Sequence, residues 1–258
     1  MPLKAPARES RSNTSRSTAI EATALSKTFQ ARGGPVHALR DVSFSAAAGE
    51  TLGVVGPSGC GKSTLLEVLC GLEQPSSGSL AVQGRCALMP QRDLLMPWRS
   101  ALDNAALAPQ LQGAPKGTAR RRAHELFERF GLEEFADARP DELSLGMRQR
   151  VAFARTLLAD RPVLLLDEPF AALDSITRAE LQQWLVIALA VEPRTTLLVT
   201  HDIEEALFVC DRVLVMSRRP GTIRAEVPGV HERSAPRAEV VTSPQFSALR
   251  RRALEALS

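Results

Sequence analysis

The residues with the clearest chemical potential form a glycine-rich segment between two apolar stretches. The segment follows the apolar run Thr51 to Val55, precedes Leu65 to Leu72, and reads Gly56-Pro57-Ser58-Gly59-Cys60-Gly61-Lys62-Ser63-Thr64. Glycines let the backbone curl so that successive N–H groups point at phosphate oxygens, and the start of a helix adds its positive dipole end. We expect Lys62 to reach the β- and γ-phosphates of a nucleotide and the Ser63 hydroxyl to bind Mg²⁺. The segment therefore predicts a phosphate-binding loop.

Two adjacent carboxylates follow a second apolar run. The segment Val163 to Leu166 ends in Asp167-Glu168-Pro169, where the proline is expected to end a strand. Ligands of parallel sheets bind at the carboxyl ends of the strands. Asp167 suits Mg²⁺, directly or through water, and Glu168 is placed to deprotonate the water that attacks the γ-phosphate. Such a pair can also be a solvated strand end, but the loop upstream favours the catalytic interpretation.

A third segment, Leu143 to Arg150, is predicted to open a helix with Ser144 as the N-cap residue. Gly146 permits a close backbone approach. Since a helix N-terminus offers free amides, Ser144 and Gly146 form a candidate second phosphate-binding surface. Taken alone, the segment is better explained as a capped helix, and only its neighbours favour the binding interpretation.

Composition narrows the class of protein. The 258 residues are 44% hydrophobic, with a net charge of +3, which fits one domain with a sizeable insertion. The charge is too balanced, and the aromatics too few, to favour nucleic acid as a partner. The four cysteines show no metal or Cys-x-x-Cys spacing and are expected to be free thiols in a reducing cytosol. The longest apolar stretch, Trp184 to Val191, is far shorter than the roughly 20 residues of a spanning helix.

The elements that must position these residues follow from hydrophobic periodicity. Residues 1–17 are rich in Ser, Arg and Pro and are predicted to be a disordered tail. An antiparallel flank is predicted before the glycine-rich loop, with a turn over 30–35. The strands predicted before residue 90 are Ile20 to Phe29, Val36 to Phe44, Thr51 to Val55, Ser79 to Val82 and Cys86 to Met89.

The period of the pattern then changes. Apolar spacing is helical from Leu102 to Leu158, with an internal loop over Gln112 to Gly117, and predicts an all-helical insertion. Strand and helix patterns then alternate, which implies a doubly wound sheet. The strands predicted there are Val163 to Leu166, Thr196 to Val199, Arg212 to Met216 and Thr222 to Val227, and the helices are Arg178 to Ala190 and Pro244 to Leu257.

From Thr18 onward the chain resembles the ATPase subunits of ABC transporters. The resemblance rests on the ordered set of the glycine-rich loop, Gln91, Leu143 to Arg150, Val163 to Pro169, Ala171 to Asp174 and Val199 to Asp202. It implies an α/β fold: a P-loop NTPase (RecA-like) core with an antiparallel β flank and an inserted α-helical subdomain. The core would comprise residues 18–90 and 159–258, the latter with a C-terminal extension, and the helical subdomain would comprise residues 91–158.

The resemblance assigns roles to further residues. Gln91 would link Mg²⁺ and nucleotide to the helical subdomain, and Asp174 would belong to the loop that crosses a dimer interface. His201 would hold the γ-phosphate and the attacking water, and Phe29 would stack on adenine. Considered singly, Gln91 is an ordinary surface amide, His201 a strand-end histidine and Phe29 a core phenylalanine.

The resemblance also implies cofactors and partners. ATP and Mg²⁺ would lie between the glycine-rich loop, Glu168 and His201 of one copy and Ser144 of a second copy. Integral membrane permease subunits would hold the protein at the cytoplasmic face of the inner membrane, and an extracytoplasmic solute-binding protein would take part indirectly. The segments Leu94 to Trp98, Met216 to Gly221 and Ser243 to Phe246 are similar to those of nitrate, sulfonate and taurine importers.

One segment departs from the family pattern. Leu145 stands where most members have a second glycine, and Met147 stands where glutamine is common. Ser144 and Gly146, which carry the phosphate contact in the family, are retained. ATP hydrolysis is therefore expected to be retained. The sequence does not determine how Leu145 and Met147 pack at the closed interface.

Three other functions match the sequence less well. A regulatory GTPase needs an Asn-Lys-x-Asp motif that recognises guanine. The only asparagines, Asn13 and Asn104, are followed by Thr and Ala, so the motif is absent from the sequence. A non-transport ABC ATPase of DNA repair or translation usually carries two cassettes or long coiled coils. A small-molecule kinase leaves Ser144 and His201 without roles. No residue of the sequence names the transported solute.

Overall fold

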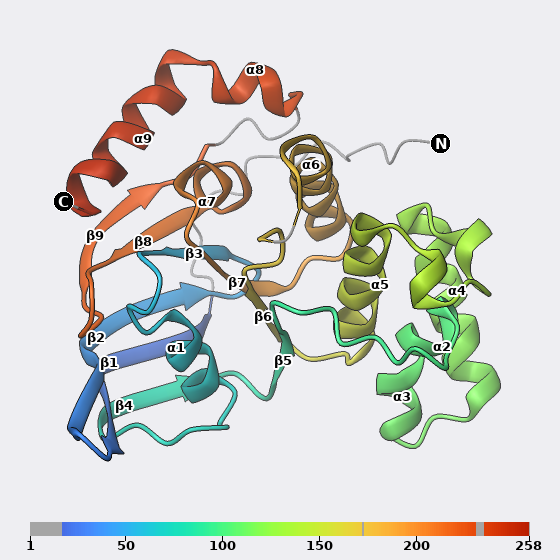
Figure 1. Cartoon of the computed structure of the whole chain (residues 1–258), viewed down its shortest axis with the longest axis horizontal. Coiled ribbons are helices and arrows are strands. Elements are labelled where there is room, and N and C mark those ends of the chain that lie inside the picture. Colours follow the sequence, from blue (N-terminus) through green and yellow to red (C-terminus); the bar gives the residue numbers. More distant parts are fainter. Residues whose placement is uncertain (1–16, 172, 231–234, 258) are drawn as a thin grey trace.

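The computed structural model describes residues 17–171, 173–230 and 235–257. Its strands form two sheets (Figure 1). One has six strands in the order β5-β6-β7-β3-β8-β9, and the other has three in the order β2-β1-β4. Residues 1–16 of the predicted tail lie outside the described residues.

The strands are β1 (Thr18–Ala31), β2 (Gly34–Ala47), β3 (Thr51–Val55), β4 (Ser77–Val82), β5 (Cys86–Met89), β6 (Val163–Asp167), β7 (Thr195–Thr200), β8 (Arg212–Met216) and β9 (Ile223–Pro228). The α-helices are α1 (Lys62–Leu69), α2 (Ala101–Ala105), α3 (Leu107–Leu111), α4 (Lys116–Phe130), α5 (Leu145–Leu158), α6 (Ser175–Val191), α7 (Ile203–Val209), α8 (Arg237–Val241) and α9 (Pro244–Leu257). Two short 3-10 helices are η1 (Glu133–Phe135) and η2 (Pro140–Glu142).

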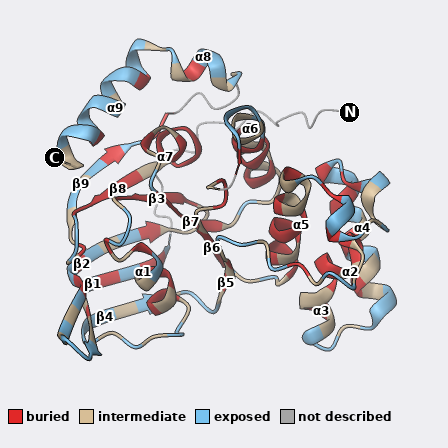
Figure 2. Cartoon of the chain, in the orientation of Figure 1, coloured by how far each residue is buried: buried red, intermediate tan, exposed pale blue. Residues whose placement is uncertain are grey.

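The six-stranded sheet is buried on both faces, which explains its apolar runs. Along β6, Leu164 and Leu166 belong to the hydrophobic cluster shared with α2 and with α4 to α9, whereas Val163 and Leu165 belong to the cluster shared with α1 and β1. Figure 2 shows the central strands buried along their length. Adjacent strands from β5 to β8 pair in parallel, and only β9 is antiparallel. A parallel sheet with both faces covered is the α/β arrangement that the sequence predicted.

The layers follow from these two clusters. Helix α1 lies between the two sheets, where Leu65 and Leu66 pack in one cluster with Ile20 of β1 and Leu214 of β8 (Figure 1). Helices α6 and α7 cover the opposite face of the six-stranded sheet, and α2 to α5 gather at one side of the molecule. The carboxyl ends of β3 and β6 therefore remain free to carry polar side chains.

The β1–β2 hairpin is longer and its turn shorter than predicted. Pairing continues to Ala31 and Gly34, and Gln30 pairs with Pro35, so residues predicted as connection are strand. Gly34 takes a φ of +107°, which other residues avoid, and so permits the tight reversal. Pro35 is tolerated because β2 is an edge strand of its sheet and a proline cannot donate to a ladder.

Helix α7 was not predicted. Its side chains from Ala206 to Val209 are all buried, so the segment has no polar face and no amphipathic period. The signal that exists is its N-cap: the Asp202 side chain accepts hydrogen bonds from the backbone amides of Glu204 and Glu205 at 2.8 and 3.2 Å. The other predicted strands and helices are confirmed to within a few residues at their ends.

Among the described helices, none combines the length and the apolar character that crossing a membrane requires.

One carboxyl group of α7 is buried in an unusual setting. Burial raises the pKa of Glu205 from 4.5 to about 8. Its Oε2 accepts a hydrogen bond from Gln182 Nε2 at 3.5 Å, and Oε1 has no hydrogen-bond partner among the described residues. The neutral carboxylic acid is therefore the form that the fold prefers.

This setting predicts a pH-dependent stability. Between pH 4.5 and about 8 the folded chain keeps a proton on Glu205 that the unfolded chain has released, so stability falls as pH rises. Glu205→Gln, neutral at every pH, should gain stability relative to wild type over this range, by up to about 1.4 kcal/mol per pH unit. Urea unfolding at several pH values measures the gap, with the exposed Glu255→Gln as control. A gap that does not change with pH contradicts the assignment.

Candidate nucleotide site

The glycine-rich loop lies between the end of β3 and the start of α1, as predicted. Gly59 and Gly61 take φ values of +74° and +111°. A Cβ on Gly61 would lie 2.7 Å from the backbone oxygen of Ala38, so both conformation and space require glycine there. Gly61 is the N-cap residue of α1 and has no side chain to cap it. The first amides of α1 are therefore open to an anion.

Lys62 places a buried cation within this loop. Its Nζ donates to the carbonyl oxygens of Gly56 and Pro57 at 2.8 and 3.2 Å. The same atom lies 3.7 Å from Glu168 Oε1. The loop thus bends around an ammonium group that links the end of β3 to the end of β6.

Ser63 and Asp167 bring two oxygen ligands together. Ser63 Oγ donates to Asp167 Oδ2 at 3.2 Å, across more than a hundred residues of sequence. Burial raises the pKa of the Asp167 carboxyl, and the hydrogen bond from Ser63 opposes that rise. A hydroxyl and a carboxylate are ligands that Mg²⁺ prefers.

Glu168 and His201 form the next contact along the sheet edge. His201 Nδ1 lies 3.1 Å from Glu168 Oε2. The backbone of Glu168 has a φ of +44°, and its N–H donates to the Val199 oxygen at 2.8 Å, which fixes the residue against the end of β7. The Glu168 side chain is 17% exposed and that of His201 is 52% exposed, so the pair reaches from a shielded position to solvent.

A pocket of about 420 Å³ collects most of the predicted residues. Its lining is Phe29, Val36, Ala38, Ser58, Gly59, Gly61, Lys62, Ser63, Thr64, Gln91, Glu168 and Arg219. Volumes of this order suit a small organic ligand or nucleotide. Phe29 is half-buried rather than part of the core, and Lys27 Nζ lies 4.8 Å from the centre of its ring. Arg219 was not predicted as a site residue, because the sequence offered it only as part of a family-like segment.

Three residues of the glycine-rich loop do not line this pocket. Gly56 and Pro57 contribute through the carbonyl oxygens that hold Lys62. Cys60 is buried in the cluster between the two sheets, and this burial raises the pKa of its thiol. Gly56, Pro57 and Cys60 therefore contribute to the conformation of the loop rather than to the wall of the pocket.

Ser144, Gly146 and Asp174 lie outside the pocket as well. Ser144 caps α5 by accepting from the Met147 amide at 3.2 Å, as predicted, and Asp174 caps α6 by accepting from the Ile176 and Thr177 amides. The hydrogen bonds from Thr177 lower the pKa of Asp174. A Cβ on Gly146 would lie 3.2 Å from Thr177 Cγ2, so the two helix starts adjoin. Ser144 and Asp174 are both exposed.

The two residues that depart from the family pattern pack against neighbouring apolar side chains. Leu145 and Met147 are half-buried and pack against the hydrophobic cluster of the helices. Neither side chain displaces Ser144 from its capping position. The exposed start of α5 is thus retained.

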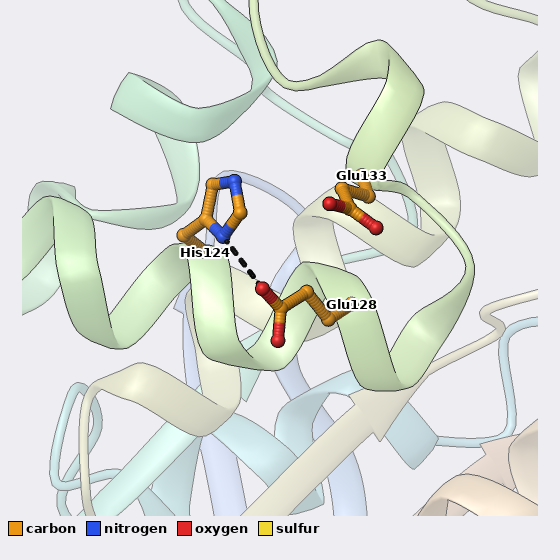
Figure 3. A group of neighbouring side chains, drawn as sticks. All are labelled: His124, Glu128 and Glu133. Carbon is orange, nitrogen blue, oxygen red and sulfur yellow. Dashed lines mark ion pairs between the residues drawn. The ribbon is translucent and has the colours of Figure 1, made fainter.

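One further group, within the part of the chain that the structure describes, has the ligand atoms of a metal site. It consists of His124 and Glu128 of α4 with Glu133 of η1 (Figure 3). His124 Nδ1 lies 3.2 Å from Glu128 Oε1, one helical turn away, and both glutamates are exposed. A solvated ion pair explains this grouping, which lies among the helices at the side of the molecule away from α1.

Fold and site together define a nucleotide-binding protein with a phosphate loop at the edge of a parallel sheet. The family model described as ABC transporter matches residues 39–171. The chain belongs to the ABC transporter family and is an ATPase.

Several relatives are similar over most of the chain. The nitrate import ATP-binding protein NrtD of Synechococcus elongatus is 43% identical, over 90% of this chain and 89% of that protein. The taurine import ATP-binding protein TauB of Pseudomonas aeruginosa is 40% identical, over 92% and 94%. The aliphatic sulfonates import ATP-binding protein SsuB 1 of Pseudomonas savastanoi is 47% identical, over 74% and 78%.

A solved structure resembles the fold. The dimeric post-hydrolysis state of the ATP-binding cassette MJ0796, bound to ADP and Pi, matches with a TM-score of 0.69 and 29% identity. The match covers 81% of this chain and 98% of that one.

The position of Lys62 predicts the effect of its removal. Lys62→Ala should reduce ATP affinity by at least about 100-fold, because it removes the cation from the phosphate side of the pocket. Equilibrium binding of a fluorescent ATP analogue measures the change. Lys116→Ala, an exposed lysine of α4, is the control and should bind as wild type. Unchanged affinity in Lys62→Ala would refute the phosphate-loop assignment.

Proposed function

We propose that the chain is the ATP-hydrolysing subunit of a membrane importer for a small anionic or zwitterionic solute, and that it works as a dimer with ATP between the copies. The dimer is proposed because the predicted site residues fall into two separate groups within one chain. Asp167 and His201 do not line the pocket of one chain, but they contact its residues Ser63 and Glu168. Among the described residues, the side chains of Ser144 and Asp174 instead form hydrogen bonds only with the starts of their own helices. Ser144 and Asp174 are both exposed, so a second copy can reach them. A second copy supplies what the pocket lacks.

The residues present fit a magnesium ion beside the phosphates. Ser63 Oγ and Asp167 Oδ2, only 3.2 Å apart, would hold it, with Gln91 on the pocket wall. Bound there, Mg²⁺ would neutralise charge on the β- and γ-phosphates. Lys62 would contact the same phosphates from the loop, and Phe29 would stack on the base at the other end of the pocket.

Glu168 is the proposed general base. The Lys62 ammonium lies 3.7 Å from one of its carboxylate oxygens, and the His201 ring lies 3.1 Å from the other. A water oriented by Glu168 would transfer a proton to it while attacking the γ-phosphate. His201, the more exposed of the two, would orient that water and contact the phosphate.

The segment from Gln91 to Trp98 is the proposed contact with the permease subunits. Leu94 and Trp98 are 56% and 71% exposed, which is unusual for large apolar side chains. The segment is anchored to α5, because Arg148 Nε lies 3.2 Å from Asp93 Oδ2 and Arg155 Nη1 donates to the Leu94 oxygen at 2.8 Å. Closure at Ser144, where α5 begins, would therefore move this segment too.

The relatives direct the choice of solute. Since similar chains carry the names of nitrate, taurine and aliphatic sulfonate import proteins, we infer that this chain serves one of these solutes or a similar one. It would lie on the cytoplasmic face of the membrane, bound to permease subunits that receive solute from an extracytoplasmic binding protein. Deletion of the gene should abolish growth on one such compound as sole nitrogen or sulfur source. Unimpaired growth on every candidate contradicts the import assignment.

The general-base assignment predicts a separation of binding from turnover. Glu168→Gln should lower ATP turnover by at least about 100-fold, because the amide cannot accept the proton, while ATP still binds and stabilises the dimer. Phosphate release measures turnover, and gel filtration with ATP measures the dimer. Glu239→Gln, on the exposed side of α8, is the control. Turnover at the wild-type level in Glu168→Gln would rule the base out.

A further inference from the structure

The Met216 to Gly221 segment, which the proposed function leaves unused, borders a second and larger pocket. The segment connects β8 to β9, and the pocket has a volume of about 730 Å³. Four arginines line it: Arg40 of β2, Arg218 and Arg219 of the connection, and Arg224 of β9. The end of α9, which lies beside β9 in Figure 1, closes another side.

These arginines have no anionic partner in the part of the chain that the structure describes. None of the four makes a side-chain ion pair or hydrogen bond within residues 17–171, 173–230 and 235–257. No acidic side chain of those residues lines the pocket. By contrast Arg212, at the other end of β8, pairs with both Glu50 and Glu226. Four like charges around one hollow repel one another, and an anion bound among them relieves that repulsion.

The connection that carries two of these arginines is held in place. The buried Ser217 hydroxyl bonds to the carbonyl oxygens of Arg218 and Pro220 at 2.9 and 3.0 Å, and the Ser217 amide donates to the Thr222 oxygen at 2.9 Å. Gly221 is fixed to β2, because its amide donates to the Ala38 oxygen at 2.9 Å. Guanidinium groups on a fixed backbone lose less entropy when they bind.

The rest of the lining indicates the size and chemistry of the ligand. Pro220, Ala256 and Leu257 give the pocket an apolar side. A single inorganic ion would use only part of 730 Å³, whereas pockets of this size usually hold organic molecules. Guanidinium groups bind phosphate oxygens in bidentate geometry, so a phosphate ester with an apolar or aromatic body matches both sides.

We propose that this arginine pocket is a second anion-binding site that takes a phosphate ester. It adjoins the nucleotide pocket, since Arg219 lines both, but its other arginines are absent from the nucleotide pocket. The proposal does not depend on the solute that the importer carries. The phosphate comes from a soluble ester or from a phospholipid headgroup, and the two sources differ in the tests below.

The test removes Arg218 and Arg224, which do not line the nucleotide pocket. Inorganic pyrophosphate is titrated calorimetrically into the full-length Lys62→Ala chain. This background is chosen because phosphate binding at the glycine-rich loop should be weakened in it. Adding Arg218→Ala and Arg224→Ala should weaken pyrophosphate binding about tenfold for each arginine, as expected for charged hydrogen bonds. The control adds Arg32→Ala and Arg251→Ala, two exposed arginines outside the pocket, with the same change of charge.

A second measurement distinguishes the source of the phosphate. Sedimentation with phosphatidylcholine vesicles, with and without phosphatidic acid, compares the same variants. Arginine-dependent pyrophosphate binding supports the site and a soluble ester, while arginine-dependent binding to phosphatidic acid vesicles alone supports the site and a lipid headgroup. Thermal unfolding without ligand confirms that each variant is folded. If the Arg218 and Arg224 variant matches its control in both measurements, the site is refuted.

Discussion

The site depends on one chain of side-chain contacts, from Lys62 through Glu168 to His201. These residues follow three different strands, β3, β6 and β7, and the contacts of 3.7 and 3.1 Å join the three strand ends. Glu168 adopts a positive φ in the middle of this chain, where its amide is held by Val199. Lys62 and His201 each contact one of the two carboxylate oxygens of Glu168, which holds this side chain at a shielded position of the sheet edge.

The buried sheet makes this arrangement possible. Apolar side chains cover both faces of β3, β6 and β7. The polar side chains of the site therefore lie at the ends of these strands. The carboxyl ends of neighbouring parallel strands meet at one edge, which is why residues separated by more than a hundred positions come within hydrogen-bond distance. The connection between β8 and β9 leaves the same sheet nearby and brings Arg219 to the nucleotide pocket.

Much of this was predictable from local patterns. The loop glycines, the strand before Asp167 and the Ser144 cap each have a signal within a few residues, and the structure places all of them as expected. The length of the β1–β2 hairpin was not predictable in this way, because Pro35 and Gly34 read as a break although an edge position tolerates both. Helix α7 was missed since complete burial removes the amphipathic period. Arg219 lies on a connection that is held against β2 by backbone hydrogen bonds of Gly221, and such long-range contacts leave no local pattern in the sequence.

The proposed division of the site between two copies can be tested directly. Lys62 lines the nucleotide pocket and Ser144 does not, so two inactive variants can complement each other only if a site is shared between copies. Lys62→Ala and Ser144→Arg should each be inactive alone. In a mixed dimer, one of the two sites then combines an intact loop with an intact Ser144, and the other carries both changes.

ATP hydrolysis by a mixture of Lys62→Ala and Ser144→Arg chains is therefore the most direct measurement. A site completed by the second copy predicts that mixing restores hydrolysis well above that of either variant, with the effect increasing as the two approach equal amounts. If the mixture is no more active than its separate components, the two-copy site is contradicted.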